Sequence, residues 1–255
     1  MIIVFIGAGN LATRLSLEMH RAGMTIGQVY SRTLEHAQQL ARKIGADATD
    51  QLHEIRTDAD IYIFALKDAV LEEVISKMTP NKGLWVHTAG SMPMDIFKGY
   101  VERYGVLYPF QTFSKGKSVV FDEVPFLLES HHEKDAKILK RIANSLTTDV
   151  WFLDSEKRKY VHLSGVYACN FVNHIYVLAS KILEEQQIPS DILLPLITET
   201  AEKIRTLPPV AAQTGPAVRY DENVMNKHLA LLEDTCMKDI YLMLSKSIYK
   251  TVTNE

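Results

Sequence analysis

Three polar side chains interrupt a long apolar stretch in the second half of the chain at helical spacing. His162, Val166 and Asn170 follow one another at four-residue steps, and Asn173 comes three residues later, so His162, Asn170 and Asn173 share one face of a helix. Histidine donates or shuttles protons near neutral pH, and an asparagine amide can orient a carbonyl group. The pattern predicts catalytic roles for these three residues. The alternative is structural, because buried His and Asn side chains often satisfy backbone groups where helices cross.

A proline-rich segment carries a second set of polar side chains. Prolines at positions 208, 209 and 216 predict a long loop over residues 207–216, because proline is not tolerated inside a helix. Long ordered loops in compact domains are frequently functional, so we expect Gln213, Thr214 and Arg219 to bind substrate. Arg219 could pair with a substrate carboxylate or form a salt bridge with Asp221 or Glu222.

The chain opens with an apolar run, residues 2–6, that leads into Gly7, Ala8, Gly9, Asn10, Leu11 and Ala12 and then into an amphipathic segment. A strand, a glycine-rich turn and a helix in this order are the context of the GxGxx(G/A) fingerprint of dinucleotide-binding Rossmann folds. The glycines permit a tight turn and a close approach of backbone to pyrophosphate, and the helix N-terminus favours an anion. We expect residues 7–11 to bind the phosphates of a dinucleotide. The alternative is that the glycines only shape a turn.

The second predicted strand indicates which dinucleotide is bound. NAD enzymes place Asp or Glu at its end, whereas NADP enzymes offer positive charge and hydroxyl groups there. This strand ends in Ser31, Arg32 and Thr33, and Arg32 can form a bidentate contact with a 2′-phosphate. The sequence predicts NADP as the cofactor. A surface arginine at a strand end is the simpler alternative.

Short apolar runs alternate with amphipathic stretches over the first half of the chain, and only helical patterns follow. Strands are predicted at residues 2–7, 27–31, 60–66, 84–87, 105–108, 125–128 and 150–153, and helices at 11–22, 34–44, 70–78 and 133–146. This alternation predicts an α/β fold with a doubly wound, mostly parallel sheet. Helices are predicted at 157–185, 192–205 and 224–249. We expect a dinucleotide-binding domain at 1–153 and an all-helical domain for dimerisation and substrate binding at 154–255.

Composition excludes several classes of protein. With 47% hydrophobic and 23% charged residues and a formal net charge of -3, the chain has no general attraction for nucleic acid or membrane. The opening apolar run has no preceding basic region, so it is interpreted as a strand of a cytoplasmic protein rather than a signal peptide. Cys169 and Cys236 are expected to be reduced core residues. The pairs at 131–132 and 234–239 lack metal-ligand spacing, so no catalytic metal is expected.

The first 110 or so residues resemble pyrroline-5-carboxylate reductases and deazaflavin-dependent NADP reductases. The resemblance depends on Gly7–Asn10, on Ser31 and Arg32, and on two further segments, Ala65-Leu66-Lys67 and Thr88-Ala89-Gly90-Ser91. It implies that residues 65–67 and 88–91 cover the nicotinamide ribose, and we assign Ala65, Leu66, Lys67, Thr88, Ala89 and Gly90 to cofactor binding. His87 precedes the second of these segments, where it could face a ligand or simply finish a strand.

The second half resembles a helical domain of unknown function that follows a Rossmann-like domain. The segments that carry this resemblance are residues 108–113, 162–174 and 213–221, and Gln111 in the first is taken as a further substrate-binding residue. The expected helical fold is that of the C-terminal domain of 6-phosphogluconate dehydrogenase. Related hydroxyacid dehydrogenases carry a lysine four residues before an asparagine, but Val166 occupies that position before Asn170. Transfer of their mechanism is therefore in doubt.

These features predict an NADP-dependent oxidoreductase that transfers a hydride to or from a small keto, imine or hydroxy acid. The alternative is a non-catalytic NADP-binding dimeric module that senses redox state or a ligand, which the missing lysine favours. We expect a homodimer formed through the helical half, because residues 161–182 carry more apolar surface than such a domain can cover. The substrate is expected between the domains, near the ends of the strands at 2–7, 60–66 and 84–87.

Overall fold

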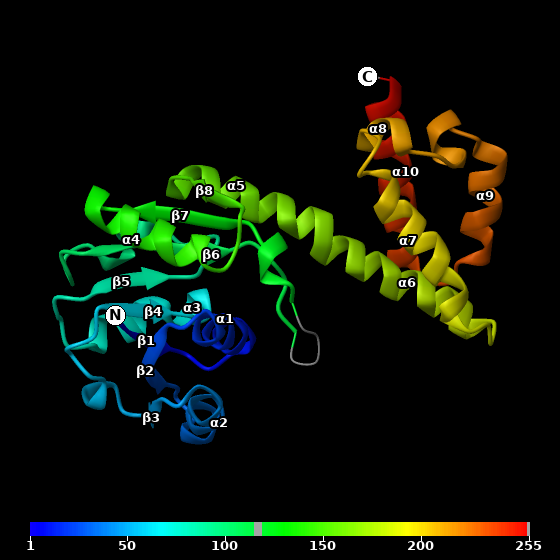
Figure 1. Ribbon diagram of the computed structural model, residues 1–255. Helices are drawn as coiled ribbons and strands as arrows, with labels where there is room; N and C mark the ends of the chain where they lie inside the picture. Colours follow the sequence, from blue (N-terminus) through cyan, green and yellow to red (C-terminus); the bar gives the residue numbers. More distant parts are fainter. Residues whose placement is uncertain (115–118, 254–255) are drawn as a thin grey trace. The chain divides into compact units, whose positions relative to one another are not determined.

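In the computed structural model, eight strands of the first half of the chain form one sheet (Figure 1). The structure describes residues 1–114 and 119–253. The strands are β1 (Ile2–Ile6), β2 (Thr25–Tyr30), β3 (Asp47–Thr49), β4 (Ile61–Phe64), β5 (Leu84–His87), β6 (Tyr104–Pro109), β7 (Phe126–Ser130) and β8 (Val150–Phe152). Their order is β3-β2-β1-β4-β5-β6-β7-β8, and β6 and β7 form the antiparallel pair. The doubly wound, mostly parallel sheet expected from the sequence is confirmed.

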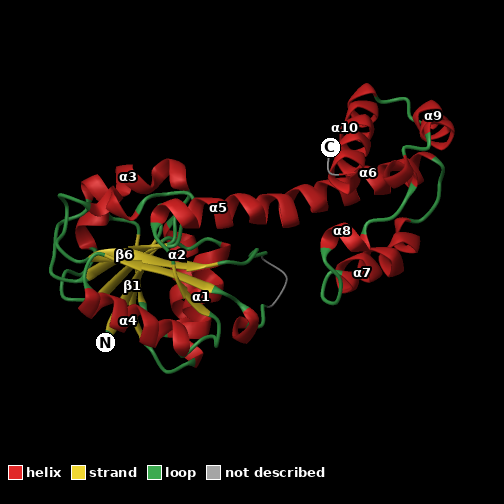
Figure 2. Cartoon of the chain, turned by 90° about the horizontal axis from the view of Figure 1, so that it is seen from above, coloured by secondary structure: helices red, strands yellow, loops and turns green. Residues whose placement is uncertain are grey.

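Helices cover both faces of this sheet (Figure 2). One face packs against α1 (Asn10–Arg21), α2 (Leu34–Ile44) and α4 (Glu133–Asn144), and the other packs against α3 (Asp68–Lys77) and α5 (Ser155–Gly165). Successive strand residues serve opposite faces, since Phe5 joins the first apolar cluster and Val4 and Ile6 join the second. Strands buried on both faces account for the continuous apolar runs in the sequence.

The strand β3 was absent from the sequence-based prediction. It has three residues, Asp47–Thr49, and pairs with β2 at the edge of the sheet. So short a segment contains no apolar alternation that would indicate a strand. The other strands lie within a few residues of their predicted bounds, and α2 has the predicted bounds of 34–44.

The chain divides into two compact units, Met1–Val166 and Tyr167–Glu255. This division differs from the boundary expected after residue 153. The reason is that α5 packs on the sheet, where Val161 contacts the cluster formed by Val106, Tyr108 and Leu127. The first helix of the second half of the chain thus belongs to the first unit.

The second unit is all-helical, with α6 (Val172–Glu185), α7 (Leu194–Lys203), α8 (Pro209–Ala212), α9 (Glu222–Leu231) and α10 (Thr235–Thr253). Two expectations were wrong here. The predicted helix 224–249 is two helices, because Asp234 accepts a hydrogen bond from the amide of Met237 and caps the second one. The predicted loop 207–216 contains the one-turn helix α8, in which proline occupies the first turn, where it is tolerated.

The helical stretch predicted at 157–185 is also interrupted. Residues Val166–Phe171 form a π-helical turn between α5 and α6. A π-helical turn holds more residues than an α-helical one, so the spacing rule that put His162, Asn170 and Asn173 on one face does not apply across it.

Few side chains of the second unit are buried. Among its described residues, the buried ones are Ala217, Met225, Met237 and Ser245, whereas large apolar residues such as Phe171, Ile182 and Leu196 are exposed. Cys169 and Cys236 are both exposed free cysteines, so their assignment to the core was wrong. In the described part of the chain, no helix combines the length and the apolar character needed to cross a membrane.

Candidate functional site

The turn after β1 requires glycine. Gly7 has a φ of +119°, a left-handed value that other residues rarely adopt. A Cβ on Gly7 would lie 2.4 Å from the carbonyl oxygen of Ala65, which follows β4. The Gly7 amide donates a hydrogen bond to the carbonyl of Tyr30 in β2 over 2.8 Å. This turn therefore joins the ends of three neighbouring strands at the edge where β1, β2, β4, β5 and β6 end, called here the carboxyl edge.

Helix α1 begins at this edge and offers its N-terminus there. Gly9 occupies the N-cap position without a side-chain cap, and the first turn contains no acidic residue. Uncapped amide groups at a helix N-terminus favour a bound anion. The side-chain amide of Asn10 donates to the carbonyl of Phe113 over 3.1 Å. Ala12 is fully buried, which agrees with close packing of this helix on the sheet.

A cavity of about 490 Å³ opens beside the glycine turn. It contains most of the residues assigned to cofactor binding by sequence, namely Gly7, Ala8, Gly9, Ser31, Arg32, Ala65, Leu66 and Lys67. A second cavity, of about 410 Å³, shares Ala8 and Gly9 and adds Asn10. Residues far apart in the sequence thus line two cavities that share Ala8 and Gly9 of the turn.

The charged side chains along this cavity suit the 2′-phosphate that NADP carries and NAD lacks. Arg32 is exposed and forms no hydrogen bond or ion pair with the described residues. The nearby carboxylate of Glu73 is paired with Lys77, whose Nζ lies 2.6 Å from Oε1. The hydroxyl of Ser31 accepts a hydrogen bond from the amide of Thr33 over 3.4 Å and keeps its own proton for a ligand. Positive charge, hydroxyl groups and a helix N-terminus fit NADP.

Residues 88–93, which follow β5, are held by hydrogen bonds to the side chain of His87. This histidine is fully buried. Its Nδ1 accepts a hydrogen bond from the Ala89 amide over 3.1 Å, and its Nε2 lies 3.3 Å from the carbonyl of Pro93, to which it donates. Burial, aided by the charge of Arg158, lowers the pKa of His87 to about 3. His87 is therefore a neutral structural residue, which decides between the two roles left open by the sequence. It holds Thr88, Ala89 and Gly90, all buried, in place.

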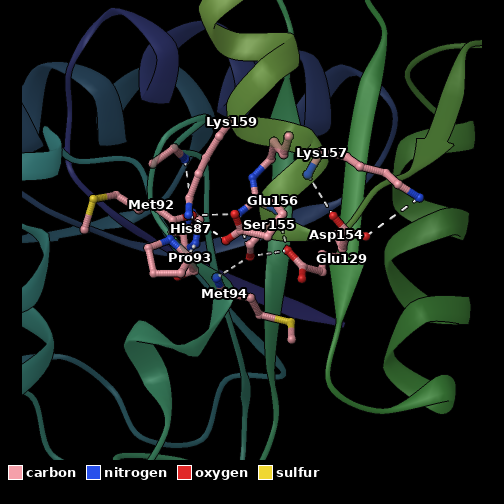
Figure 3. A network of polar contacts seen from close by, with 12 residues as sticks. His87, Met92, Pro93, Met94, Glu129, Asp154, Ser155, Glu156, Lys157 and Lys159 are labelled. Carbon is pink, nitrogen blue, oxygen red and sulfur yellow. Dashed lines mark hydrogen bonds and ion pairs between the residues drawn. The ribbon is translucent and has the colours of Figure 1, made fainter.

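Side chains of helix α5 also form hydrogen bonds with the segment that follows β5 (Figure 3). The fully buried guanidinium of Arg158 pairs with Glu129 of β7 and donates to the carbonyl of Met92 over 2.6 Å. Ser155 donates to Glu129 over 2.7 Å and accepts a hydrogen bond from the Met94 amide over 2.9 Å. The segment 88–94 is thus held by hydrogen bonds from β5 and from α5.

His162 lies one helical turn after Arg158 on α5. Its side chain contacts residues at the carboxyl edge of the sheet. Its Nδ1 lies 3.0 Å from the hydroxyl of Tyr108, near the end of β6. Its ring packs against Gly90, where a Cβ would come within 2.5 Å of Nδ1. Nearby, Ser91 donates to the carboxylate of Asp68 at the start of α3. A titratable side chain therefore stands beside residues expected to cover the nicotinamide ribose.

The structure gives no contact between His162 and the other predicted substrate-site residues that it describes. Asn170, Asn173, Gln213, Thr214 and Arg219 belong to the second unit and are exposed, and their part in the site stays a prediction. Within the described residues, Arg219 forms no ion pair, because Asp221 instead caps α9 through the Val224 amide. Gln111 is exposed, and its side chain accepts a hydrogen bond from the Thr112 amide over 2.8 Å.

Sequence reasoning missed Tyr108, Arg158 and Glu129. Arg158 stands between two lysines, a pattern typical of a solvated surface. Its position four residues before His162 was the available signal, since such residues share a helical face. Among residues 1–114 and 119–253, no group of three or more His, Cys, Asp or Glu side chains is arranged to hold a metal ion.

Two family models match separate parts of the chain. Residues 2–87 match the family described as NADP oxidoreductase, coenzyme F420-dependent, and residues 124–248 match a domain of unknown function, DUF2520. None of the curated proteins matches the chain.

Solved structures are similar to this chain over nearly its whole length. A Bacteroides fragilis protein provisionally named an NADP oxidoreductase is 48% identical, with 98% of each chain covered and a TM-score of 0.91. The protein TM1727 from Thermotoga maritima is 25% identical over 97% of this chain and 99% of its own, with a TM-score of 0.78. A pyrroline-5-carboxylate reductase from Coxiella burnetii, 15% identical over 99% and 97% of the two chains, shares the fold with a TM-score of 0.57.

The predicted cofactor class and reaction class are those of the family that matches residues 2–87, and the resemblance of the second half to a helical domain of unknown function is confirmed. Because identity to the Bacteroides fragilis protein is 48% over nearly the full length of both chains, the chain belongs to the same family of NADP oxidoreductases.

Proposed function

We propose that this chain transfers a hydride between NADP(H) and a small keto, imine or hydroxy acid at the carboxyl edge of the sheet. The observation that carries the proposal is the position of His162, which contacts Gly90 and Tyr108 at the same edge of the sheet at which the strands lining the nucleotide cavity end. Open α/β sheets bind ligands at this edge, and a histidine there can serve as an acid or base.

Residues 7–11 would hold the pyrophosphate, Ser31, Arg32 and Thr33 the 2′-phosphate, and residues 65–67 and 88–90 the nicotinamide ribose. When bound, NADPH supplies the hydride that reduces the acceptor carbon. His162 would donate a hydrogen bond to the acceptor oxygen or nitrogen and polarise it, and the proton that this atom takes up would come from water. Asn170 and Asn173 would orient the acceptor, and Gln111, Gln213, Thr214 and Arg219 would bind the rest of the substrate.

We further propose a cytoplasmic homodimer assembled through the second unit. Exposed apolar side chains such as Phe171, Ile175 and Ile182 recur along this unit, while few of its described residues are buried. Exposed apolar side chains in this number indicate an interface between proteins when they form one patch. A second copy of the same unit offers equally apolar surface, and twofold dimers are the commonest assemblies of soluble proteins.

A non-catalytic NADP-binding dimeric module is the second candidate. Val166 occupies the position at which related hydroxyacid dehydrogenases carry a lysine acid, four residues before Asn170. Such a module would bind NADPH with the same contacts and would turn over no substrate.

The test is a turnover assay with NADPH and small 2-keto acids or cyclic imino acids, and with NADP and hydroxy acids in the reverse direction. We expect turnover of at least one class. His162→Gln should lower kcat on the order of 100-fold and leave NADPH affinity within about twofold, because it replaces only the imidazole that faces the acceptor. The matched control His20→Gln changes an exposed histidine on α1. NADPH binding without turnover of any class would favour the non-catalytic module, and absence of NADPH binding would refute both.

A further inference from the structure

Tyr108 and His162 form a hydrogen-bonded pair whose geometry is fixed on several sides. The tyrosine is 8% exposed and shares an apolar cluster with Val106 and Leu127. Its hydroxyl lies 3.0 Å from Nδ1 of His162, and the two rings meet edge to face with centroids 6.1 Å apart. Tyr108 is therefore held by the sheet, and His162 is held against it by α5.

The backbone of the segment after β5 closes the other side of the imidazole. A Cβ on Gly90 would lie 2.5 Å from Nδ1 and 2.7 Å from Cγ of His162, so glycine is needed here for space. With Tyr108 and Gly90 both beside Nδ1, the edge of the ring that carries Nε2 faces away from them. Within the described part of the chain, Nε2 has no protein partner, so it is available to a ligand.

The hydrogen bond of Tyr108 indicates which nitrogen of neutral His162 carries the proton. Burial, together with the negative charge of Asp68, raises the pKa of Tyr108 to about 12, although Arg158 opposes the shift. The phenol therefore keeps its proton throughout the working pH range. Among the described residues its hydroxyl has Nδ1 as its partner, and a phenol that donates to Nδ1 leaves the proton of a neutral imidazole on Nε2.

We propose that Tyr108 is a positioning residue that fixes the tautomer of His162, so that Nε2–H is directed as a hydrogen-bond donor to the carbonyl or imine group of the substrate. The inference rests on the proposed function for its consequence in catalysis. Its structural part concerns only the Tyr108–His162 pair. A histidine whose second nitrogen is held by a hydrogen bond has one defined tautomer and orientation. Without the hydroxyl, both tautomers of neutral His162 become accessible.

The first experiment measures the tautomer directly and does not require a substrate. Imidazole nitrogen shifts are recorded by NMR on the full-length protein with 15N-labelled histidine, at a pH where His162 is neutral. The chain contains nine histidines, and the signals of His162 are those that His162→Gln removes. We expect the Nε2–H tautomer in the unmodified protein and a mixture of tautomers in Tyr108→Phe.

The matched control is Tyr104→Phe, which removes the same hydroxyl from a buried tyrosine of the same strand, where the ring stacks on His131. We expect the signals of His162 to be unchanged in this variant. An Nδ1–H tautomer in the unmodified protein would overturn the inference. Unchanged His162 signals in Tyr108→Phe would also overturn it, whatever the activity of the enzyme.

The second experiment tests the consequence for catalysis. Tyr108→Phe should lower kcat by roughly 3- to 10-fold, less than His162→Gln does, because the Nε2–H tautomer stays partly populated. KM and NADPH affinity should stay within about twofold, whereas Tyr104→Phe should leave all three unchanged. A purely structural role would instead lower the melting temperature without changing kcat in the folded protein, and that result would overturn the inference. If the tautomer is as expected but no substrate class is turned over, the proposed function fails and the assignment of the pair stands.

Discussion

The two units of this chain differ in how completely each buries its own apolar residues. In the first, strand residues such as Phe5, Ile63 and Val86 are fully buried between helices on both faces of the sheet. In the second, residues of the same type on α6 and α7 are exposed. The first unit thus contains a complete core, whereas the second leaves many large apolar side chains exposed, which is the basis of the proposed homodimer. Changes in the first should act on folding and ligand binding of one chain, and changes in the second on assembly.

The largest expected effect is on the folding of the first unit. Arg158→Met should lower the free energy of unfolding by about 3–5 kcal/mol, because Glu129 would remain largely buried without its partner. Urea denaturation measures the change. In the control, Arg21→Met removes an exposed arginine from its pair with Glu18 and should cost less than about 1 kcal/mol. Equal losses in the two variants would contradict the role given to Arg158.

The next effect concerns the second unit and assembly. The double substitution Ile175→Glu with Ile182→Glu places charges seven residues apart on one face of α6. We expect it to raise the dissociation constant of the homodimer at least on the order of 100-fold, about 2.7 kcal/mol, as measured by sedimentation equilibrium. Val120→Glu changes an apolar residue of the first unit that is 65% exposed and should leave the dimer intact. If the unmodified protein is monomeric at micromolar concentration, the proposed homodimer is refuted.

Arg32→Ala tests ligand binding by the first unit. It should weaken NADPH binding by about 10- to 150-fold, or about 1.5–3 kcal/mol, and change NADH binding little, because only NADPH has the 2′-phosphate. Isothermal titration with both cofactors measures the difference. Arg42→Ala changes an exposed arginine in the last turn of α2 and should change neither affinity. Equal losses for the two cofactors in Arg32→Ala would reject the assignment.

Acid should destabilise the first unit through His87. The pKa of His87 is about 3 in the folded chain, against about 6.5 for an unperturbed histidine. Between these values the unfolded chain binds a proton that the folded chain does not, so stability is intact above about pH 6.5 and falls as the pH is lowered. We expect a loss of about 2 kcal/mol by about pH 5. Denaturation curves of His87→Gln should lack this component, and an identical pH dependence would contradict it.

The sequence predicted the parts of this molecule that depend on local pattern. Alternating apolar runs gave the order of strands and helices, and the glycine turn with Arg32 gave the nucleotide cavity. The π-helical turn was not predictable, because residues 166–171 resemble the α-helical residues around them. The partners of His162 were also missed, since Tyr108 and Gly90 approach it only when the sheet and α5 have assembled.

The buried pair of Arg158 and Glu129 has a consequence for how members of this family diverge. Both residues lie in the matched segment 124–248, and either alone would leave a charge in a site with little access to water. Single substitutions at these positions should therefore be selected against, while joint replacement by two apolar residues is tolerated. Among related chains, position 158 and position 129 should vary together, and a chain that has lost the arginine should have lost the carboxylate as well.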